Sequence, residues 1–140
     1  MRITVIDGQG GRIGGLLIER IRKLQVPAEI TAVGTNSVAT AAMLKAGADF
    51  GATGENPAVV ACRDADLILG PVGIVLADAL LGEVTAAMAA AVSRSRAHKI
   101  LIPLNRCGHT IVGVQELPLG GYILRHGGAD VPHSVLLLGS

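Results

Sequence analysis

Short apolar runs alternate along this chain with segments whose apolar residues recur at helical spacing. We expect strands at residues 1–6, 28–34, 48–53, 65–70 and 99–105, with a sixth candidate at 109–114. The helical pattern covers residues 13–24, 37–47, 55–64 and 74–97, with a break near Gly82 in the last segment. Alternation at this spacing predicts βαβ units with right-handed crossovers. The expected fold is α/β: a three-layer, Rossmann-like open sheet, mostly parallel, with five to six strands and helices on both faces.

The composition agrees with helices packed on a parallel sheet. Half of the residues are hydrophobic, yet Phe50 and Tyr122 are the only aromatic ones, so Val, Ile, Leu and Ala must fill the core. A chain of 140 residues matches one domain of ordinary size. We expect a Rossmann-like nucleotide-binding domain over residues 1–115 and a C-terminal tail or oligomerisation arm over residues 116–140.

The charge is nearly balanced, with 12 Lys and Arg residues against 11 Asp and Glu residues and no basic cluster. We therefore expect no nucleic-acid partner. The chain begins directly in a strand, without the pattern of a signal peptide, and no apolar run reaches the ~18 residues that span a membrane. Two cysteines, Cys62 and Cys107, make no disulfide framework. These features predict a cytoplasmic protein with no membrane partner.

The stretch VIDGQGGRIGG, residues 5–15, places a glycine-rich turn between the first strand and the first helix. In an open parallel sheet this turn lies at the carboxyl edge, where ligands bind. Backbone N–H groups and a positive helix end receive an anion there only where no Cβ holds it away. We therefore expect a phosphorylated ligand or nucleotide to contact Gly8, Gln9, Gly10, Gly11, Arg12, Ile13 and Gly14. The alternative is a tight turn with close helix-to-strand packing and no ligand.

The turn differs from the loop of a nucleoside triphosphatase. Such a loop carries a Lys and a Ser or Thr after its last glycine, whereas Gly14 is followed by Gly15 and Leu16. No side chain is therefore expected to bridge the outer phosphates or to hold magnesium.

Two resemblances to known families bear on this turn. Residues 8–14, GQGGRIG, resemble the GAxGRMG nucleotide-binding loop of dihydrodipicolinate reductases, which holds a nicotinamide dinucleotide; the substrate domain of those enzymes has no counterpart here. Nearly the whole chain resembles a family of short bacterial proteins, domain of unknown function 3842. This second resemblance is carried by VIDGQGG, VGTNSVATAAMLKAGAD, GATGEN, GPVGIVLADALLGEVT and KILIPLN. That family implies no established reaction.

The end of the second strand bears on which dinucleotide would bind. Folds that hold an adenosine ribose by its free hydroxyls place an Asp or Glu there, but residues 34–37 are Gly, Thr, Asn and Ser. A neutral cluster at a helix start suits a phosphate better, so we expect NADP(H) rather than NAD(H), held by Thr35, Asn36 and Ser37. The alternative is that Asn36 or Ser37 simply caps the next helix. The opposite wall of the groove is expected to be Gly70, Pro71 and Gly73.

Asp7 opposes an anion at the same place, because a carboxylate repels phosphate unless a cation or hydrogen bonds offset it. Arg12 offsets this charge, or Asp7 faces a metal or a ribose; the sequence does not choose between these.

The candidates for catalysis are Glu55, Asp7, Cys107 and His109. Glu55 follows the third strand on the same rim and suits a general acid or base, the alternative being an exposed acid beside a helix dipole. Cys107 and His109 follow the fifth strand and suit a nucleophile and its base, the alternative being a surface loop. The Cys and His residues lack the spacing of a zinc site, so we expect no metal.

Three functions are compatible with these residues, and whether the chain is an enzyme stays open. The first is a nucleotide-binding module, with an NADP(H)-type dinucleotide favoured, that acts as a sensor or subunit. The second is a small NAD(P)-dependent oxidoreductase whose active site is completed at an oligomer interface. The third is a structural assembly protein with an empty glycine loop. The apolar content and the tail favour a homo-oligomer in the first two cases.

Overall fold

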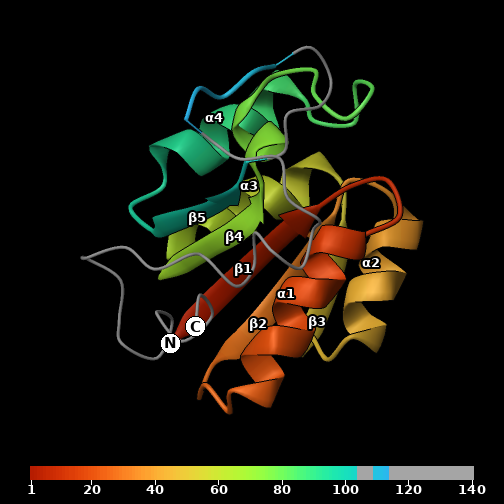
Figure 1. Ribbon diagram of the computed structural model, residues 1–140, viewed down its shortest axis with the longest axis vertical. Helices are drawn as coiled ribbons and strands as arrows, with labels where there is room; N and C mark the ends of the chain where they lie inside the picture. The colour runs from red at the N-terminus through yellow and green to blue at the C-terminus, as the bar shows by residue number, and fades with distance from the viewer. Residues whose placement is uncertain (104–108, 114–140) are drawn as a thin grey trace.

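The computed structural model describes residues 1–103 and 109–113. In this part of the chain one parallel sheet has the strand order β3-β2-β1-β4-β5 (Figure 1). The strands are β1 (Arg2–Asp7), β2 (Glu29–Gly34), β3 (Phe50–Thr53), β4 (Leu67–Pro71) and β5 (His98–Ile102). The helices are α1 (Arg12–Lys23), α2 (Ser37–Lys45), α3 (Glu55–Asp64), the 3-10 helix η1 (Val72–Val75) and α4 (Ala86–Arg94).

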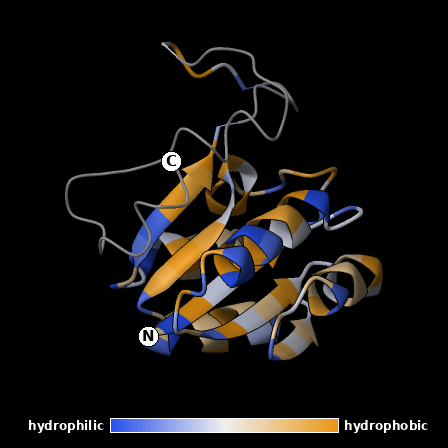
Figure 2. Ribbon diagram, turned by 60° about the horizontal axis from the view of Figure 1, so that its bottom comes forward, coloured by the Kyte–Doolittle hydropathy of each residue, from blue (hydrophilic) through white to orange (hydrophobic). Residues whose placement is uncertain are grey.

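The sheet is covered on both faces, which makes three layers. Alternate residues of β1 point to opposite faces: Ile3 and Val5 pack with α1 and α2, whereas Ile6 packs with α3 and α4. Both faces of the central strands are therefore apolar, and Figure 2 shows the hydrophobic strands between helices with mixed surfaces. The expected open α/β sheet with helices on both faces is confirmed.

Helix α1 illustrates how the sequence pattern becomes packing. Leu17, Ile18 and Ile21 recur at helical spacing and are buried against the sheet, each with an exposed fraction of 2% or less. Burying one such side chain contributes about 1.5–3 kcal/mol relative to leaving it in water. The basic residues Arg20, Arg22 and Lys23 fall in the last turn, where they complement the helix dipole.

The expected helix over residues 74–97 is wrong in its first half. Residues 76–84, called the cover turn below, form irregular turns between η1 and α4. Asp78, Leu80 and Leu81 have φ values of 66°, 55° and 58°, which no α-helix contains. Burial of Ala79 and Val84 in the core holds this conformation against the local helical pattern.

Smaller differences concern helix starts and the sixth strand. Helix α2 begins as expected, with the Asn36 side chain accepting a hydrogen bond from the Ala39 amide at 2.9 Å. The sequence pair Asn56-Pro57 is typical of an N-cap followed by the first helical residue. The expectation that α3 starts there is wrong, because α3 begins at Glu55 with Gly54 before it and Asn56 is a helical residue. Residues 109–113 form no strand. The expected tail, residues 116–140, lies outside the described residues.

No helix in the described part of the chain has the length and apolar character needed to span a membrane.

Candidate functional site

The glycine turn, residues 8–11, joins the carboxyl end of β1 to the start of α1 at the centre of the sheet. The Gly11 amide donates to the Gly8 carbonyl at 2.9 Å and closes the turn. Gln9 and Gly11 both have positive φ, 49° and 69°. Strands β2 and β4 flank β1, so the turn lies at the carboxyl edge of the sheet, as expected.

Gly8 and Gly11 are required by packing. A Cβ on Gly8 would lie 2.5 Å from Thr35 Oγ1, and a Cβ on Gly11 would lie 2.7 Å from the Ala39 carbonyl oxygen. Real Cβ atoms essentially never approach other atoms so closely. Gly8 therefore lets the turn approach Thr35 after β2, and Gly11 lets it approach α2, whether or not a ligand is present.

Gly14 and Gly10 differ in what an added side chain would meet. A Cβ on Gly14 would overlap the Met43 side chain, so this glycine brings α1 against α2. A Cβ on Gly10 would meet no atom within 4 Å. Gly10 is exposed, and packing gives no reason for its lack of a side chain.

The Asp7 carboxylate is buried, with 4% of the residue exposed, and accepts hydrogen bonds from amides of the glycine turn and of the first turn of α1. Gly8 donates to Oδ1 at 2.8 Å and Gly14 donates to Oδ2 at 2.7 Å. Desolvation raises the pKa of Asp7 and outweighs the hydrogen bonds from Gly14, Gly8 and Ile13, which lower it. Backbone N–H groups, not Arg12, therefore offset this charge.

A second carboxylate, that of Glu83, reaches the glycine turn from the cover turn. The Gln9 amide donates to Oε1 at 3.1 Å and Thr35 Oγ1 donates to the same oxygen at 2.8 Å. Asn36 Nδ2 donates to Oε1 at 2.5 Å and to the Gln9 carbonyl at 2.9 Å. Sequence reasoning missed Glu83 because it lay within an expected helix, and only the break near Gly82 hinted otherwise.

The neutral cluster at the end of β2 is thus already engaged. Asn36 caps α2 with its Oδ1, and both Thr35 and Asn36 donate to Glu83. Ser37 is exposed at the first turn of α2. Thr35 and Asn36 were expected to donate hydrogen bonds to a 2′-phosphate, but they donate to the Glu83 carboxylate instead.

Some polar groups of the turn have no acceptor or partner among the described residues. The amides of Gly10 and Arg12 donate to none of these residues. The Arg12 side chain is exposed and forms no ion pair within the same part of the chain. The Ile13 side chain is partly buried and packs against the core. Two amides and one guanidinium at the junction of the glycine turn and α1 are therefore without a bonded partner in this part of the chain.

The residues expected to form the opposite wall of the groove pack against other parts of the protein. Gly70, Pro71 and Gly73 are buried. A Cβ on Gly70 would overlap the Ile6 carbonyl oxygen, and one on Gly73 would meet side chains of the cover turn. These glycines permit close packing of β4 on β1 and of the cover turn on η1.

The catalytic candidates are only partly brought together. Glu55 lies on the same rim as the glycine turn and accepts a hydrogen bond from Thr85 Oγ1 at 2.9 Å. His109 is exposed, and Cys107 lies outside the described residues. Within the described ranges no group of three His, Cys, Asp or Glu side chains is arranged to hold a metal ion.

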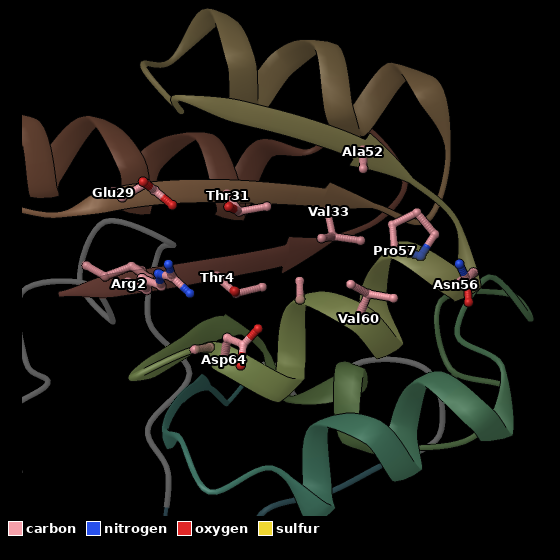
Figure 3. A pocket seen from close by; sticks show the side chains of 13 residues that line it. Arg2, Thr4, Glu29, Thr31, Val33, Ala52, Asn56, Pro57, Val60 and Asp64 are labelled. Atoms are coloured by element: carbon pink, nitrogen blue, oxygen red, sulfur yellow. The ribbon is translucent and has the colours of Figure 1, made fainter.

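A pocket of about 460 Å³ lies elsewhere, between α3 and the sheet face formed by β1, β2 and β3 (Figure 3). Thr4 and Thr31 are paired across β1 and β2 on its floor, with Val60 on the α3 side. Its lining includes no residue of the glycine turn. It is therefore separate from the site expected from the sequence.

Comparison with known proteins gives one match. A family model described as "Domain of unknown function (DUF3842)" matches residues 2–126. Neither the curated proteins nor the solved structures contain a match to this chain.

Proposed function

We propose that this chain, which belongs to the DUF3842 family, is a binding module for a phosphate-bearing nucleotide at the glycine turn, with a nicotinamide dinucleotide as the expected ligand. The observation that carries the proposal is Gly10. Packing explains Gly8, Gly11 and Gly14, but a side chain at position 10 would only occupy the open space above the turn. A phosphate in that space is a reason for glycine there.

The groups around Gly10 suit an anion. The amides of Gly10 and Arg12 lack acceptors among the described residues, and Arg12 adds a guanidinium, which binds phosphate in bidentate fashion. The start of α1 adds the positive end of a helix dipole. Asp7 lies buried, and the amides of Gly8 and Gly14 donate to its carboxylate and offset its charge.

The resemblance of residues 8–14 to the loop of dihydrodipicolinate reductases favours a dinucleotide over a free phosphate. A module of this kind acts as a nucleotide sensor or as a subunit of a larger assembly. Binding alone requires only the turn, α1 and the end of β2, all of which belong to one protomer.

Calorimetry and thermal unfolding with NAD, NADP, ADP and ATP test the proposal. At a concentration one hundred times the dissociation constant, a ligand stabilises the fold by about 2.7 kcal/mol. A Gly10→Val variant is expected to fold, since a Cβ at this exposed position meets no protein atom within 4 Å, but to lose nucleotide binding.

Gly15→Ala is the matched control, because a Cβ there makes only an ordinary contact, 3.8 Å from Ala46 Cβ within the packed helices. It is expected to keep nucleotide binding and to gain about 0.5–1 kcal/mol of stability. Absence of any shift with all four nucleotides, or unchanged binding in folded Gly10→Val, would overturn the proposal.

A further inference from the structure

The carboxylate of Glu83 occupies the corner between the glycine turn and the end of β2. Its hydrogen-bond donors come from both sides of that corner: the Gln9 amide, Thr35 Oγ1 and Asn36 Nδ2. In parallel α/β sheets this corner lies beside the ribose of a bound nucleotide, and an acid there accepts hydrogen bonds from the ribose hydroxyls. No residue of positions 34–37 supplies such an acid. Glu83 brings one to the corner from the cover turn.

The two oxygens of Glu83 differ in what they already bind. Oε1 accepts three hydrogen bonds, from Gln9, Thr35 and Asn36. Among residues 1–103 and 109–113, Oε2 receives only a longer contact from the Gln9 amide, at 3.3 Å. A carboxylate accepts about four hydrogen bonds in all. Oε1 therefore anchors the group, while Oε2 keeps capacity for donors from a ligand.

The cover turn fixes the position of this acceptor. The Asp78 amide donates to the Val84 carbonyl at 2.7 Å, and the Val84 amide donates to the Ala79 carbonyl at 3.1 Å. Leu80 lies against Gly8, where a Cβ would come within 2.8 Å of its Cδ1. The carboxylate is thus held in place before a ligand arrives, which lowers the entropic cost of binding.

Glu83 is also held in its ionised form. Desolvation raises its pKa, but the hydrogen bonds from Asn36, Thr35 and Gln9 together bring the pKa below its ordinary value. An ionised carboxylate accepts from hydroxyl groups and repels a phosphate placed at the same point.

We propose that Glu83 selects nucleotides whose adenosine ribose carries free hydroxyls, such as NAD(H), and rejects those with a 2′-phosphate, such as NADP(H). This inference rests on the nucleotide-binding function proposed above. It reverses the preference expected from the neutral residues 34–37, because Glu83 supplies the acid that those positions lack.

The test measures NAD and NADP affinities by calorimetry for the wild type, Glu83→Gln and Glu19→Gln. Glu19 is the matched control, since it is an exposed carboxylate of α1 that lies outside the glycine turn. The wild type and Glu19→Gln are expected to bind NAD at least about tenfold more tightly than NADP, which corresponds to 1.4 kcal/mol. Glu83→Gln is expected to lose most of this preference by weakening NAD and strengthening NADP.

A second measurement needs no variant and covers the case in which Glu83→Gln fails to fold. The wild type is expected to bind ADP more tightly than 2′,3′-dideoxy-ADP, because the latter offers no hydroxyl to Oε2. Equal affinity for the two, or a wild-type preference for NADP, would overturn the inference. So would a Glu83→Gln variant that gains affinity equally for NAD, NADP and inorganic pyrophosphate, since the carboxylate would then only compete for the phosphate site. These three results leave the proposed function standing, whereas absence of all nucleotide binding overturns both.

Discussion

Replacement of Asp7 by Ala removes the acceptor on which the glycine turn is built. The amides of Gly8 and Gly14 lie in buried residues and donate to this carboxylate at 2.8 and 2.7 Å. Each buried N–H group left without an acceptor costs about 1–3 kcal/mol. The substitution also removes a carboxylate whose burial is unfavourable, and this offsets part of the loss of stability. We expect Asp7→Ala to lower the free energy of unfolding by about 2–4 kcal/mol at neutral pH, a large share of the 5–15 kcal/mol typical of a domain.

The pH dependence of that loss follows from the direction of the Asp7 pKa shift. Burial raises the folded-state pKa of Asp7 above 3.8, its ordinary value, so the folded protein holds the proton more tightly than the unfolded chain. The stability gained from this proton is complete below pH 3.8 and is lost as pH rises through the folded-state pKa. The stability difference between wild type and Asp7→Ala should therefore widen on acidification.

Urea unfolding followed by far-UV circular dichroism, at neutral pH and in steps toward acid, measures both effects. Glu83 interacts electrostatically with Asp7, so the difference between the two proteins reports the Asp7 carboxylate together with its repulsion by Glu83. An Asp7→Ala variant as stable as the wild type at neutral pH would show that the two amides have other acceptors. A gap that narrows in acid would contradict the raised pKa.

Three further changes test other contacts. Gly14→Ala should cost about 1–3 kcal/mol by overpacking against Met43, less about 0.5–1 kcal/mol gained by Ala in a helix, and an unchanged urea midpoint would contradict it. Arg12→Gln should weaken nucleotide binding about tenfold and reduce the salt dependence of the affinity measured by calorimetry. A wild-type affinity that is the same at two salt concentrations would exclude a phosphate contact of Arg12. Desolvation by burial raises the pKa of Cys62 to about 11. In a Cys107→Ser background, iodoacetamide should therefore modify the folded chain far more slowly than the urea-unfolded chain, and equal rates would refute this.

The parts of the fold predicted from sequence depend on local pattern. The stripe of α1, the apolar strands and the Asn36 cap each rest on residues close together in the chain, so their spacing suffices. The cover turn was missed for the opposite reason. Its residues carry a helical pattern, but burial of Ala79 and Val84 in a core shared with α3 and α4 favours a different backbone.

The candidate site, like the fold, was predicted where residues close together in the chain determine it and missed where distant residues do. Its place at the end of β1 followed from one strand, one glycine-rich segment and one helix. The reason for each glycine did not, because Ala39 and Met43 meet Gly11 and Gly14 from another helix. Glu83 bonds to Gln9 across a separation of 74 residues, and no local pattern encodes such a contact.

The central strand β1 has partners that emerge from synthesis at different times. Its pairing with β2 starts at Arg2 and Glu29, whereas its pairing with β4 joins Ile3 to Leu67. A nascent chain therefore completes β1, β2, α1 and α2 while the other edge of β1 still has no strand beside it. Closing that longer loop costs more entropy, so we expect the pairing of β4 with β1 to form after that of β2. Until then the open edge of β1 is the place most exposed to pairing with another chain.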